Sequence, residues 1–289
     1  MKHAYLIIAH SSLELLQELV CALDDVRNDI YIHLDSKFLF DESVLHTEHS
    51  QLFILPVRLD ARWGDFSLVR IEFMLFEQAC QNGPYKYYHL LSGVDFPLKS
   101  QDYIHSFFEK NQGAEFIGFA QHASEKEINW RSQHYFLFPR SFQSQNIFKK
   151  VVRAICARLQ SLVGYKRIAM EVKKGCQWCS ITHDFVIYVL EKKQFVYDSF
   201  NHTYCPDEMF IQTLCWNSPF RERVYDMNDE FNGCKRYIVW KDSVIQVLDN
   251  MDVDTLVNSD RLFARKFTIN GMNLIKSISR AYVMYENRL

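Results

Sequence analysis

A strand, a helix and a second strand are predicted within residues 4–35, AYLIIAHSSLELLQELVCALDDVRNDIYIHLD. Residues 4–9 and 29–35 are short apolar runs, whereas residues 13–23 carry leucine and valine at helical spacing. This order predicts a βαβ unit, whose strands run parallel and whose ligand crevice lies at their carboxyl ends. His10 and Asp35 follow the two strands, so we expect both side chains at that crevice.

The alternation of strands and helices continues to about residue 120 and then becomes less regular. The remaining predicted strands span residues 51–56, 86–92, 115–120 and 236–240, and the remaining predicted helices span residues 66–80, 101–110, 146–163, 183–192, 207–216, 253–258 and 277–286. The pattern predicts an α/β fold with a central mixed, mostly parallel sheet flanked by helices. No linker rich in proline, glycine or serine divides the 289 residues, so we expect a single domain.

Composition excludes several classes of protein. Apolar residues make up 48% of the chain and aromatic residues 15%, which excludes a disordered chain. The formal net charge is −2, so no strong positive field favours nucleic acid, and we expect no nucleic-acid partner. The longest apolar run near the start, Tyr5 to Ala9, is too short for a signal peptide or a membrane span, which predicts a cytoplasmic protein with reduced cysteines.

The common phosphate-binding and metal-binding motifs are missing or incomplete. No two glycines form a G-x-G, and Phe119-Ala120 stand where a P-loop needs lysine and serine or threonine. An Asp-x-Asp string, which holds a divalent cation in some sugar transferases, occurs at Asp252-Val253-Asp254, but the short predicted helix after it favours a helix cap. The pair Cys176 and Cys179 lacks a second C-x-x-C, which favours two buried thiols over a zinc site.

Four further stretches are too particular to be generic: RWGDFSLV at 62–69, YHLLSGVDFPLKS at 88–100, CPDEMF at 205–210 and LFARKF at 262–267. Together with residues 4–10 and 31–35, they resemble the Core-2/I-branching β-1,6-N-acetylglucosaminyltransferase family, glycosyltransferase family 14, which also contains the peptide O-xylosyltransferases. The resemblance spans roughly residues 4–267, in the order of the family.

The resemblance implies a nucleotide-sugar transferase fold of the GT-A type, with a nucleotide-binding half at residues 1–121 and an acceptor-binding and catalytic half at residues 122–289. It implies an inverting, metal-independent transfer of N-acetylglucosamine first, or xylose second, from a UDP-sugar to a hydroxyl of a glycan or a lipid-linked saccharide, with a β linkage formed. No cofactor or metal is expected. Two alternatives stay open: a non-catalytic carbohydrate-binding relative of the same fold, and a cation-dependent transferase that uses Asp252 and Asp254.

Glu208 is the expected catalytic base. Taken alone, Pro206-Asp207-Glu208 is typical of a helix start, with proline and acidic residues in the first turn. The resemblance implies that the glutamate of this motif removes the proton from the acceptor hydroxyl, a role that an inverting transfer requires. Asp207 and Trp178 are expected on the acceptor side, where Trp178 could stack on a sugar ring.

Cationic side chains are expected to compensate the charge of the leaving diphosphate. The resemblance assigns that role to Lys266, with Arg265 beside it, although both could simply lie at a solvated strand edge. A second family cation falls where this chain has Ser243-Val244-Ile245, so Arg236 and Arg265 are left as alternatives for it.

The rest of the donor site is expected at the strand ends. The resemblance places Asp35 near the nucleoside base, Ala9-His10 beside it, and Trp63-Gly64 as the closure of the donor pocket. Asp95 stands in the turn Gly93-Val94-Asp95, where other GT-A enzymes carry Asp-x-Asp. Turn capping is the alternative role for Asp95, and a core position is the alternative for Trp63.

A basic segment follows in the second half of the chain. Between Arg140 and Lys174 there are nine basic residues against Glu171 alone, and apolar residues recur at steps of three and four through the predicted helix 146–163. This amphipathic helix predicts peripheral contact with an anionic membrane, on the inner face of the cytoplasmic membrane. The alternative is a helix packed on the core, with a solvated outer face.

Overall fold

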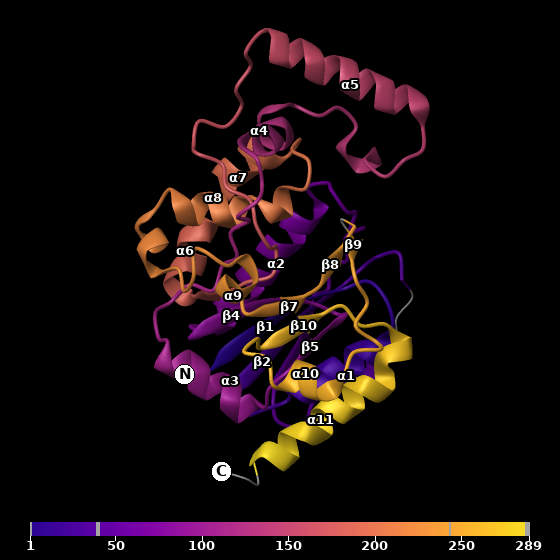
Figure 1. Ribbon diagram of the computed structural model, residues 1–289, viewed down its shortest axis with the longest axis vertical. Coiled ribbons are helices and arrows are strands. Elements are labelled where there is room, and N and C mark those ends of the chain that lie inside the picture. The colour runs from indigo at the N-terminus through magenta and orange to yellow at the C-terminus, as the bar shows by residue number, and fades with distance from the viewer. Residues whose placement is uncertain (1, 39–40, 243, 287–289) are drawn as a thin grey trace.

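The computed structural model of the protein describes residues 2–38, 41–242 and 244–286. Ser243, which lies in the segment without a second cation, is outside these residues. A five-stranded sheet in the order β3-β2-β1-β4-β6 forms the centre of the fold (Figure 1). Its strands are β1 (His3–Ala9), β2 (Asn28–Leu34), β3 (Gln51–Ile54), β4 (Tyr87–Ser92) and β6 (Ser180–Thr182). The pairs among β1 to β4 are parallel and β6 is antiparallel to β4, which confirms the expected mixed, mostly parallel sheet.

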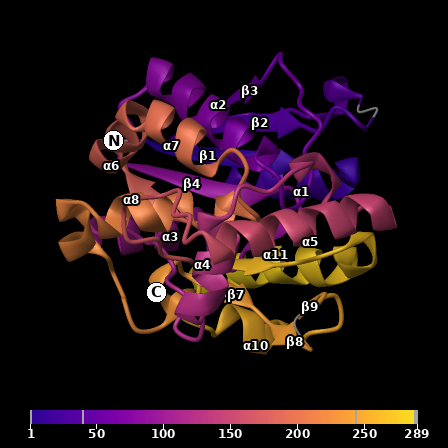
Figure 2. The same ribbon diagram turned by 90° about the horizontal axis from the view of Figure 1, so that it is seen from above.

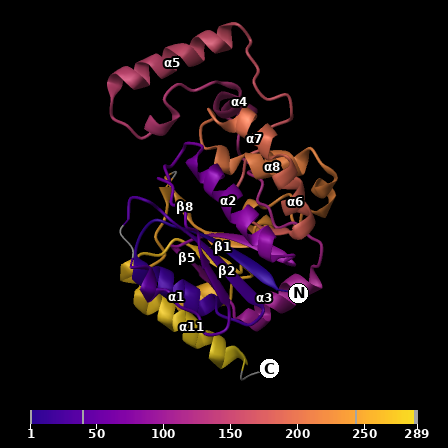
Figure 3. The same cartoon turned by 180° about the vertical axis from the view of Figure 1, so that it is seen from behind.

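The alternation of side chains along β1 divides the apolar core into two layers. Leu6 and Ile8 face a layer with α2, α6, α7 and α8, whereas Tyr5 and Ile7 face a layer with α1, α3, α10 and α11. The two groups of helices cover opposite faces of the sheet (Figures 1 and 3). The helices are α1 (Leu13–Leu23), α2 (Ser67–Asn82), α3 (Gln101–Lys110), α6 (His183–Glu191), α7 (Lys193–Phe200), α8 (Phe210–Trp216), α9 (Glu230–Gly233), α10 (Val253–Val257) and α11 (Met272–Glu286).

A second, three-stranded sheet brings distant parts of the chain together. It has the order β5-β10-β7, with β5 (Asp95–Pro97), β10 (Phe263–Arg265) and β7 (Arg236–Ile238). The antiparallel register of β5 and β10 sets Arg265 opposite Asp95. A two-stranded ribbon of β8 (Trp240–Lys241) and β9 (Val244–Ile245) follows, so the predicted strand 236–240 is in fact divided.

Two helices, α4 (Glu125–Gln133) and α5 (Ile147–Leu162), stand apart from the sheet at the top of Figure 1. Ala157 is the buried residue of α5, while Phe148 and Leu162 are 72% and 82% exposed. The alternative, a helix packed on the core, is therefore wrong. Figure 2 shows α5 lying across the molecule as an outer layer. Within the described ranges, no helix has both the length and the apolar character needed to cross a bilayer.

Two predicted elements differ from the structure. Residues 115–120 form no strand, because only isolated bridges are made, by Glu115 to Val224 and by Phe116 to Ser180. The predicted helix 207–216 is interrupted: Pro206–Glu208 form a separate 3-10 turn, η3, after Cys205 at φ 51°, and α8 begins at Phe210. The other 3-10 turns are η1 (Glu42–Val44), η2 (Pro139–Ser141), η4 (Pro219–Arg223) and η5 (Ile269–Gly271).

Candidate active site

The carboxyl ends of three parallel strands meet at one edge of the sheet. The backbone N–H of Asp35 donates to the carbonyl of Ala9 at 2.9 Å, and that of Gly93 donates to Ile8 at the same distance. A Cβ on Gly93 would lie 3.1 Å from the Cβ of Ala9, so a larger residue would push these two strand ends apart. The expected neighbourhood of Ala9, His10 and Asp35 is therefore present, although their contacts with a donor stay a prediction.

His10 is surrounded by charged groups from distant parts of the chain. Its pKa is lowered by desolvation first and by the positive charge of Arg265 second; Lys266 acts in the same direction, and Asp35 opposes the shift. Asp35 is buried, and its carboxylate lies 3.1 Å from the ammonium group of Lys37. Charged residues at the strand ends and at the end of β10 thus act on the same side chain, His10.

Asp95 and Arg265 form a buried ion pair, with 2.8 Å between Oδ1 and Nη1. The other oxygen of Asp95 accepts from the backbone N–H of Ser92 at 2.9 Å, so the turn-capping role is confirmed. Burial raises the pKa of Asp95, and the charge of Arg265 opposes the rise. The guanidinium also lies over the ring of Trp178, 4.3 Å from its centroid. Because Trp178 is buried beneath Arg265, its observed contact is with this cation, and its acceptor role stays a prediction.

Lys266 is the better placed of the expected diphosphate-binding cations. Its side chain is partly exposed, and among the described residues no carboxylate forms an ion pair with it. Arg236, one of the alternatives for the second cation, is buried and donates to the carbonyls of Cys234 and Cys179, which excludes it from contact with a ligand. Arg265 is already engaged by Asp95.

Glu208 lies between two cations. Its Oε2 atom is 2.8 Å from Nη1 of Arg131, on α4, and 3.7 Å from Nζ of Lys174. Glu127 faces the same two cations, at 3.1 and 4.0 Å. The Glu208 side chain is 26% exposed, and among the described residues no hydrogen bond is found for its Oε1. An incoming hydroxyl could therefore meet this oxygen while the arginine holds the other.

Two buried carboxyl groups lie beneath Glu208. Asp207 is 4% exposed, and its Oδ1 has no hydrogen-bond partner among the described residues. Desolvation first, and the charge of Glu208 second, raise its pKa to about 8. Glu72 of α2 is fully buried, accepts from Gln177 at 2.7 Å, and has a pKa raised well above its ordinary value by burial and then by Asp207. The carboxyl group of Asp207 is therefore mostly protonated at neutral pH, and burial favours the protonated form of Glu72.

One segment connects the expected base with the expected cations. The backbone N–H of Gly175 donates to the carbonyl of Glu208 at 2.9 Å, and Trp178, three residues later, contacts Arg265. A Cβ on Gly175 would lie 1.9 Å from the carbonyl oxygen of Gly118, so only glycine allows this crossing. Residues 175–178 thus contact the backbone of Glu208 at one end and the side chain of Arg265 at the other.

Trp63 and Gly64 contact Tyr204 and Cys205, the residues before the turn that carries the expected base. Gly64 has a φ of 86° and its carbonyl accepts from the N–H of Cys205 at 3.0 Å, while the Trp63 ring meets that of Tyr204 edge to face. Trp63 is 49% exposed, so the core alternative for it is wrong. It lines a cavity of about 390 Å³ together with Lys37, the partner of Asp35. This arrangement agrees with a closing role at the donor pocket, which stays a prediction.

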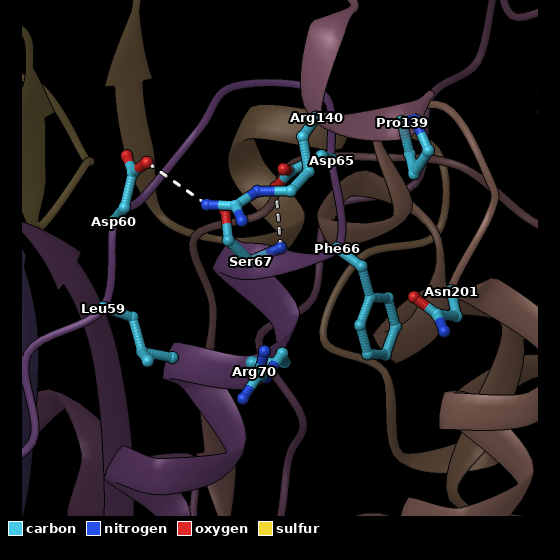
Figure 4. A pocket seen from close by; sticks show the side chains of 9 residues that line it. All are labelled: Leu59, Asp60, Asp65, Phe66, Ser67, Arg70, Pro139, Arg140 and Asn201. Atoms are coloured by element: carbon cyan, nitrogen blue, oxygen red, sulfur yellow. Dashed lines mark hydrogen bonds and ion pairs between the residues drawn. The ribbon is translucent and has the colours of Figure 1, made fainter. Parts of the chain in front are cut away.

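A neighbouring cavity of about 290 Å³ lies at the start of α2 (Figure 4). Arg140, from η2, reaches across it to Asp60 at 3.3 Å, and Asp65 accepts from the backbone N–H of Ser67. The carbonyl of Arg140 also accepts from the guanidinium of Arg62 at 3.2 Å. These contacts attach the segment before α5 to the body of the fold.

The remaining motifs have structural partners. Asp252 accepts from the backbone N–H of Thr255 at 2.9 Å, which confirms it as the cap of α10. Cys176 and Cys179 are free and buried, as expected of two incidental thiols. No group of three or more histidine, cysteine or acidic residues in the described part of the chain is arranged to hold a metal ion.

Sequence reasoning missed Arg131, Lys174 and Glu72 as members of the site. Glu72 carried a signal, since a carboxyl group stands between Val69 and Phe76 on the apolar face of the predicted helix 66–80. Arg131 carried none, because α4 has no apolar stripe and Ser132 is its buried residue.

The chain is similar to one family model and to several known proteins. The family model "Core-2/I-Branching enzyme" matches residues 3–257. Xylosyltransferase 2 of Rattus norvegicus is 23% identical over 262 residues, which cover 85% of this chain and 28% of the relative; Xylosyltransferase oxt of Drosophila melanogaster is 24% identical over 218 residues, which cover 71% and 23%. The chain therefore spans about a quarter of the length of these relatives. The crystal structure of S. aureus TarS aligns with 47% of this chain and 25% of its own, at 10% identity and a TM-score of 0.27.

The family match covers the five-stranded sheet and Asp35, Asp95 and Glu208, and it ends before Arg265 and Lys266. The expected α/β fold with a central mixed, mostly parallel sheet flanked by helices is confirmed by the strand pairing, and the match identifies the family. The chain belongs to the Core-2/I-branching enzyme family of glycosyltransferases.

Proposed function

We propose that the protein is an inverting, metal-independent glycosyltransferase that uses a UDP-sugar donor and a glycan or lipid-linked saccharide acceptor. The observation that supports this proposal is the segment of residues 175–178, which contacts the backbone of Glu208 at one end and the Arg265 side chain at the other. In the proposed site, the acid–base group and the cationic segment face one reaction space, as a transfer from a diphosphate requires.

In the proposed reaction Glu208 accepts the proton of the acceptor hydroxyl as that oxygen attacks the anomeric carbon. The bond from this carbon to the diphosphate breaks, its electron pair leaves with UDP, and a β-glycoside forms. Lys266 compensates the charge that grows on the diphosphate, while Arg265, held by Asp95, adds positive potential from behind. Arg131 holds one carboxylate oxygen of Glu208 and orients the side chain before the proton is transferred.

The donor nucleoside is proposed to lie at the strand ends. Asp35 and Ala9-His10 approach the base, and Trp63-Gly64 close the pocket over the donor. N-acetylglucosamine is the first candidate sugar and xylose the second. The names of the relatives, which are xylosyltransferases, strengthen the case for xylose.

Transfer activity tests the reaction directly. We expect release of UDP from UDP-N-acetylglucosamine or UDP-xylose, stimulated by an acceptor and fully retained in EDTA. A requirement for magnesium or manganese would instead support the cation-dependent alternative at Asp252 and Asp254, although Asp252 is occupied as a helix cap. Binding of UDP without turnover on any donor would support a non-catalytic relative.

We further propose that the protein acts in the cytoplasm and touches the inner face of the membrane through residues 146–163. Along α5 the apolar side chains Phe148, Val151, Ile155, Leu159 and Leu162 are about half exposed or more. Such a stripe is larger than isolated surface residues and indicates a partner.

The charge of this segment favours an anionic bilayer over a second copy of the chain as the partner of α5. No acidic residue occurs between Glu127 and Glu171, whereas eight basic residues do, of which Arg131 and Arg140 form ion pairs with Glu208 and Asp60. A second copy of the chain would set these cations against one another, but an anionic bilayer complements them.

Liposome co-sedimentation tests this contact. We expect binding to vesicles that contain phosphatidylglycerol and loss of binding in a Phe148→Ser, Leu159→Ser variant. Ile187→Ser, which removes an exposed apolar side chain from α6, should bind like the wild type. Equal binding to neutral and anionic vesicles would remove the proposal.

A further inference from the structure

A cavity of about 480 Å³ lies between α4, α5 and the segment before η3. Its aromatic side is formed by Trp130, Phe142 and Tyr204, and its cationic side by Lys150, Arg153 and Arg158. No acidic side chain is found among the described residues that line it. The lining therefore combines flat apolar surfaces with three positive charges that no neighbouring carboxylate neutralises.

Arg153 is the most deeply placed of the three cations. Its guanidinium lies over the ring of Phe142, 4.7 Å from the centroid, and its Nη1 is buried without a hydrogen-bond partner among the described residues. A buried donor of this kind costs free energy unless an acceptor satisfies it. An anionic oxygen in the cavity would supply that acceptor.

The cavity adjoins the expected catalytic base. Tyr204 lines it, and the guanidinium of Arg131 lies over the Tyr204 ring at 5.3 Å while it binds Glu208 at 2.8 Å. The side chain of Arg131 thus lies between Tyr204, on the cavity wall, and Glu208. The donor cations are elsewhere, since Lys266 follows β10 and lies near His10.

We propose that this cavity binds the phosphate or diphosphate group of the acceptor, so that the acceptor is a phosphate-bearing saccharide. The inference rests on the proposed function, because it deepens the acceptor side of the same site. The sugar ring stacks on the aromatic side, the phosphate oxygens meet Arg153 with Lys150 and Arg158, and a hydroxyl of the sugar reaches Glu208. A free sugar phosphate and a lipid-linked saccharide share this chemistry.

Isothermal titration with saturating UDP tests the cavity, because UDP occupies the diphosphate site of the donor. The probes are N-acetylglucosamine 1-phosphate, N-acetylglucosamine linked through a diphosphate to a decyl chain, and the neutral decyl β-N-acetylglucosaminide. We expect Arg153→Gln to weaken a phosphate-bearing probe at least about tenfold, as for the loss of one charge-assisted hydrogen bond, and to leave the neutral probe unchanged. Lys166→Gln removes one exposed charge outside the cavity and should match the wild type.

Arg158→Gln guards against a folding defect, since this exposed side chain has no packing role, and it should weaken the same probes by a smaller factor. Equal affinity of wild type and Arg153→Gln for the phosphate-bearing probes, or no preference of the wild type for them over the neutral probe, would overturn the proposal. Stronger binding of the decyl diphosphate probe than of the soluble one identifies a lipid-linked acceptor, and equal binding identifies a free sugar phosphate; both support the phosphate site.

Transfer assays separate this proposal from the proposed function. Transfer to the neutral acceptor that equals transfer to the phosphate-bearing ones would refute the phosphate site and leave the transferase intact. Phosphate binding that depends on Arg153, with no turnover on any UDP-sugar, would refute the transferase and leave the site.

Discussion

Two arginine–carboxylate pairs have the same length but different surroundings. Asp95 and Arg265 meet at 2.8 Å with side chains 1% and 13% exposed, whereas Glu208 and Arg131 meet at 2.8 Å with side chains 26% and 18% exposed. The first pair joins β5 to β10 and has Trp178 packed against it. The second lies where the outlying helix α4 meets η3, beside the cavity under α5.

The difference in burial indicates that the two ion pairs have different roles. A buried pair whose two members are fixed by a strand register supports the fold, because removal of one member leaves an unpaired buried charge. A pair with one carboxylate oxygen open to solvent can exchange contacts with a substrate. The second pair should therefore govern turnover and the first should govern stability.

Glu208→Gln should have the largest effect on turnover. The amide can still accept from Arg131, but it cannot take a proton, so kcat should fall by about 10² to 10⁴-fold while UDP affinity is retained. Initial rates of UDP release and titration with UDP measure the two quantities. Glu127→Gln loses contacts with the same Arg131 and Lys174 and should change kcat by less than about tenfold. Equal losses in the two variants would show that Glu208 is not the base.

Asp95→Asn should have the larger effect on stability. It leaves the charge of Arg265 uncompensated between the sheet edge and Trp178, so the free energy of unfolding should fall by about 3 kcal/mol or more. Denaturation in urea measures the change. Asp25→Asn breaks the more exposed pair with Arg27 and should cost less than about 1 kcal/mol. Similar losses for both would remove the distinction between a buried and an exposed pair.

Lys266→Gln should lower turnover without lowering stability. The side chain forms no ion pair among the described residues, so the unfolding transition should stay in place, whereas transfer should fall by about 10² to 10³-fold, as for one donor lost at a developing charge. UDP release and UDP affinity report the loss. Lys276→Gln, from an exposed pair with Glu18, is the matched control and should behave as wild type. Unchanged transfer in the first variant would place the diphosphate elsewhere.

The two ion pairs also show which features of the structure can be predicted from local sequence patterns and which cannot. The βαβ unit at residues 4–35 is set by periodicity within about thirty residues, and its strands and helix lie within one residue of the predicted bounds. The pair of Asp95 with Arg265 depends on three-residue strands from parts of the chain 170 positions apart, and a three-residue run shows no period. The resemblance located Asp95, Arg265 and Glu208, but nothing in the sequence located Arg131 beside Glu208.

Asp207 extends the comparison to a buried carboxyl group that forms no ion pair with an arginine among the described residues. Its effect on stability should be smaller and should depend on pH. Its pKa is raised to about 8 in the folded protein from an ordinary 3.8, so the folded state binds this proton more tightly than the unfolded state does. As pH rises from about 4 to 8, the contribution of Asp207 lowers the free energy of unfolding, by at most about 1.4 kcal/mol per pH unit, and it becomes constant above pH 8. Asp207→Asn should remove this slope, so its free energy of unfolding should rise relative to that of the wild type between pH 5 and 8. Urea denaturation at several pH values measures the difference. Asp198→Asn, at an exposed carboxylate, is the control, and its free energy of unfolding should change with pH as that of the wild type does. If the curve of Asp207→Asn also runs parallel to that of the wild type, the Asp207 carboxyl group is ionised in the folded protein and the site holds a second negative charge beside Glu208.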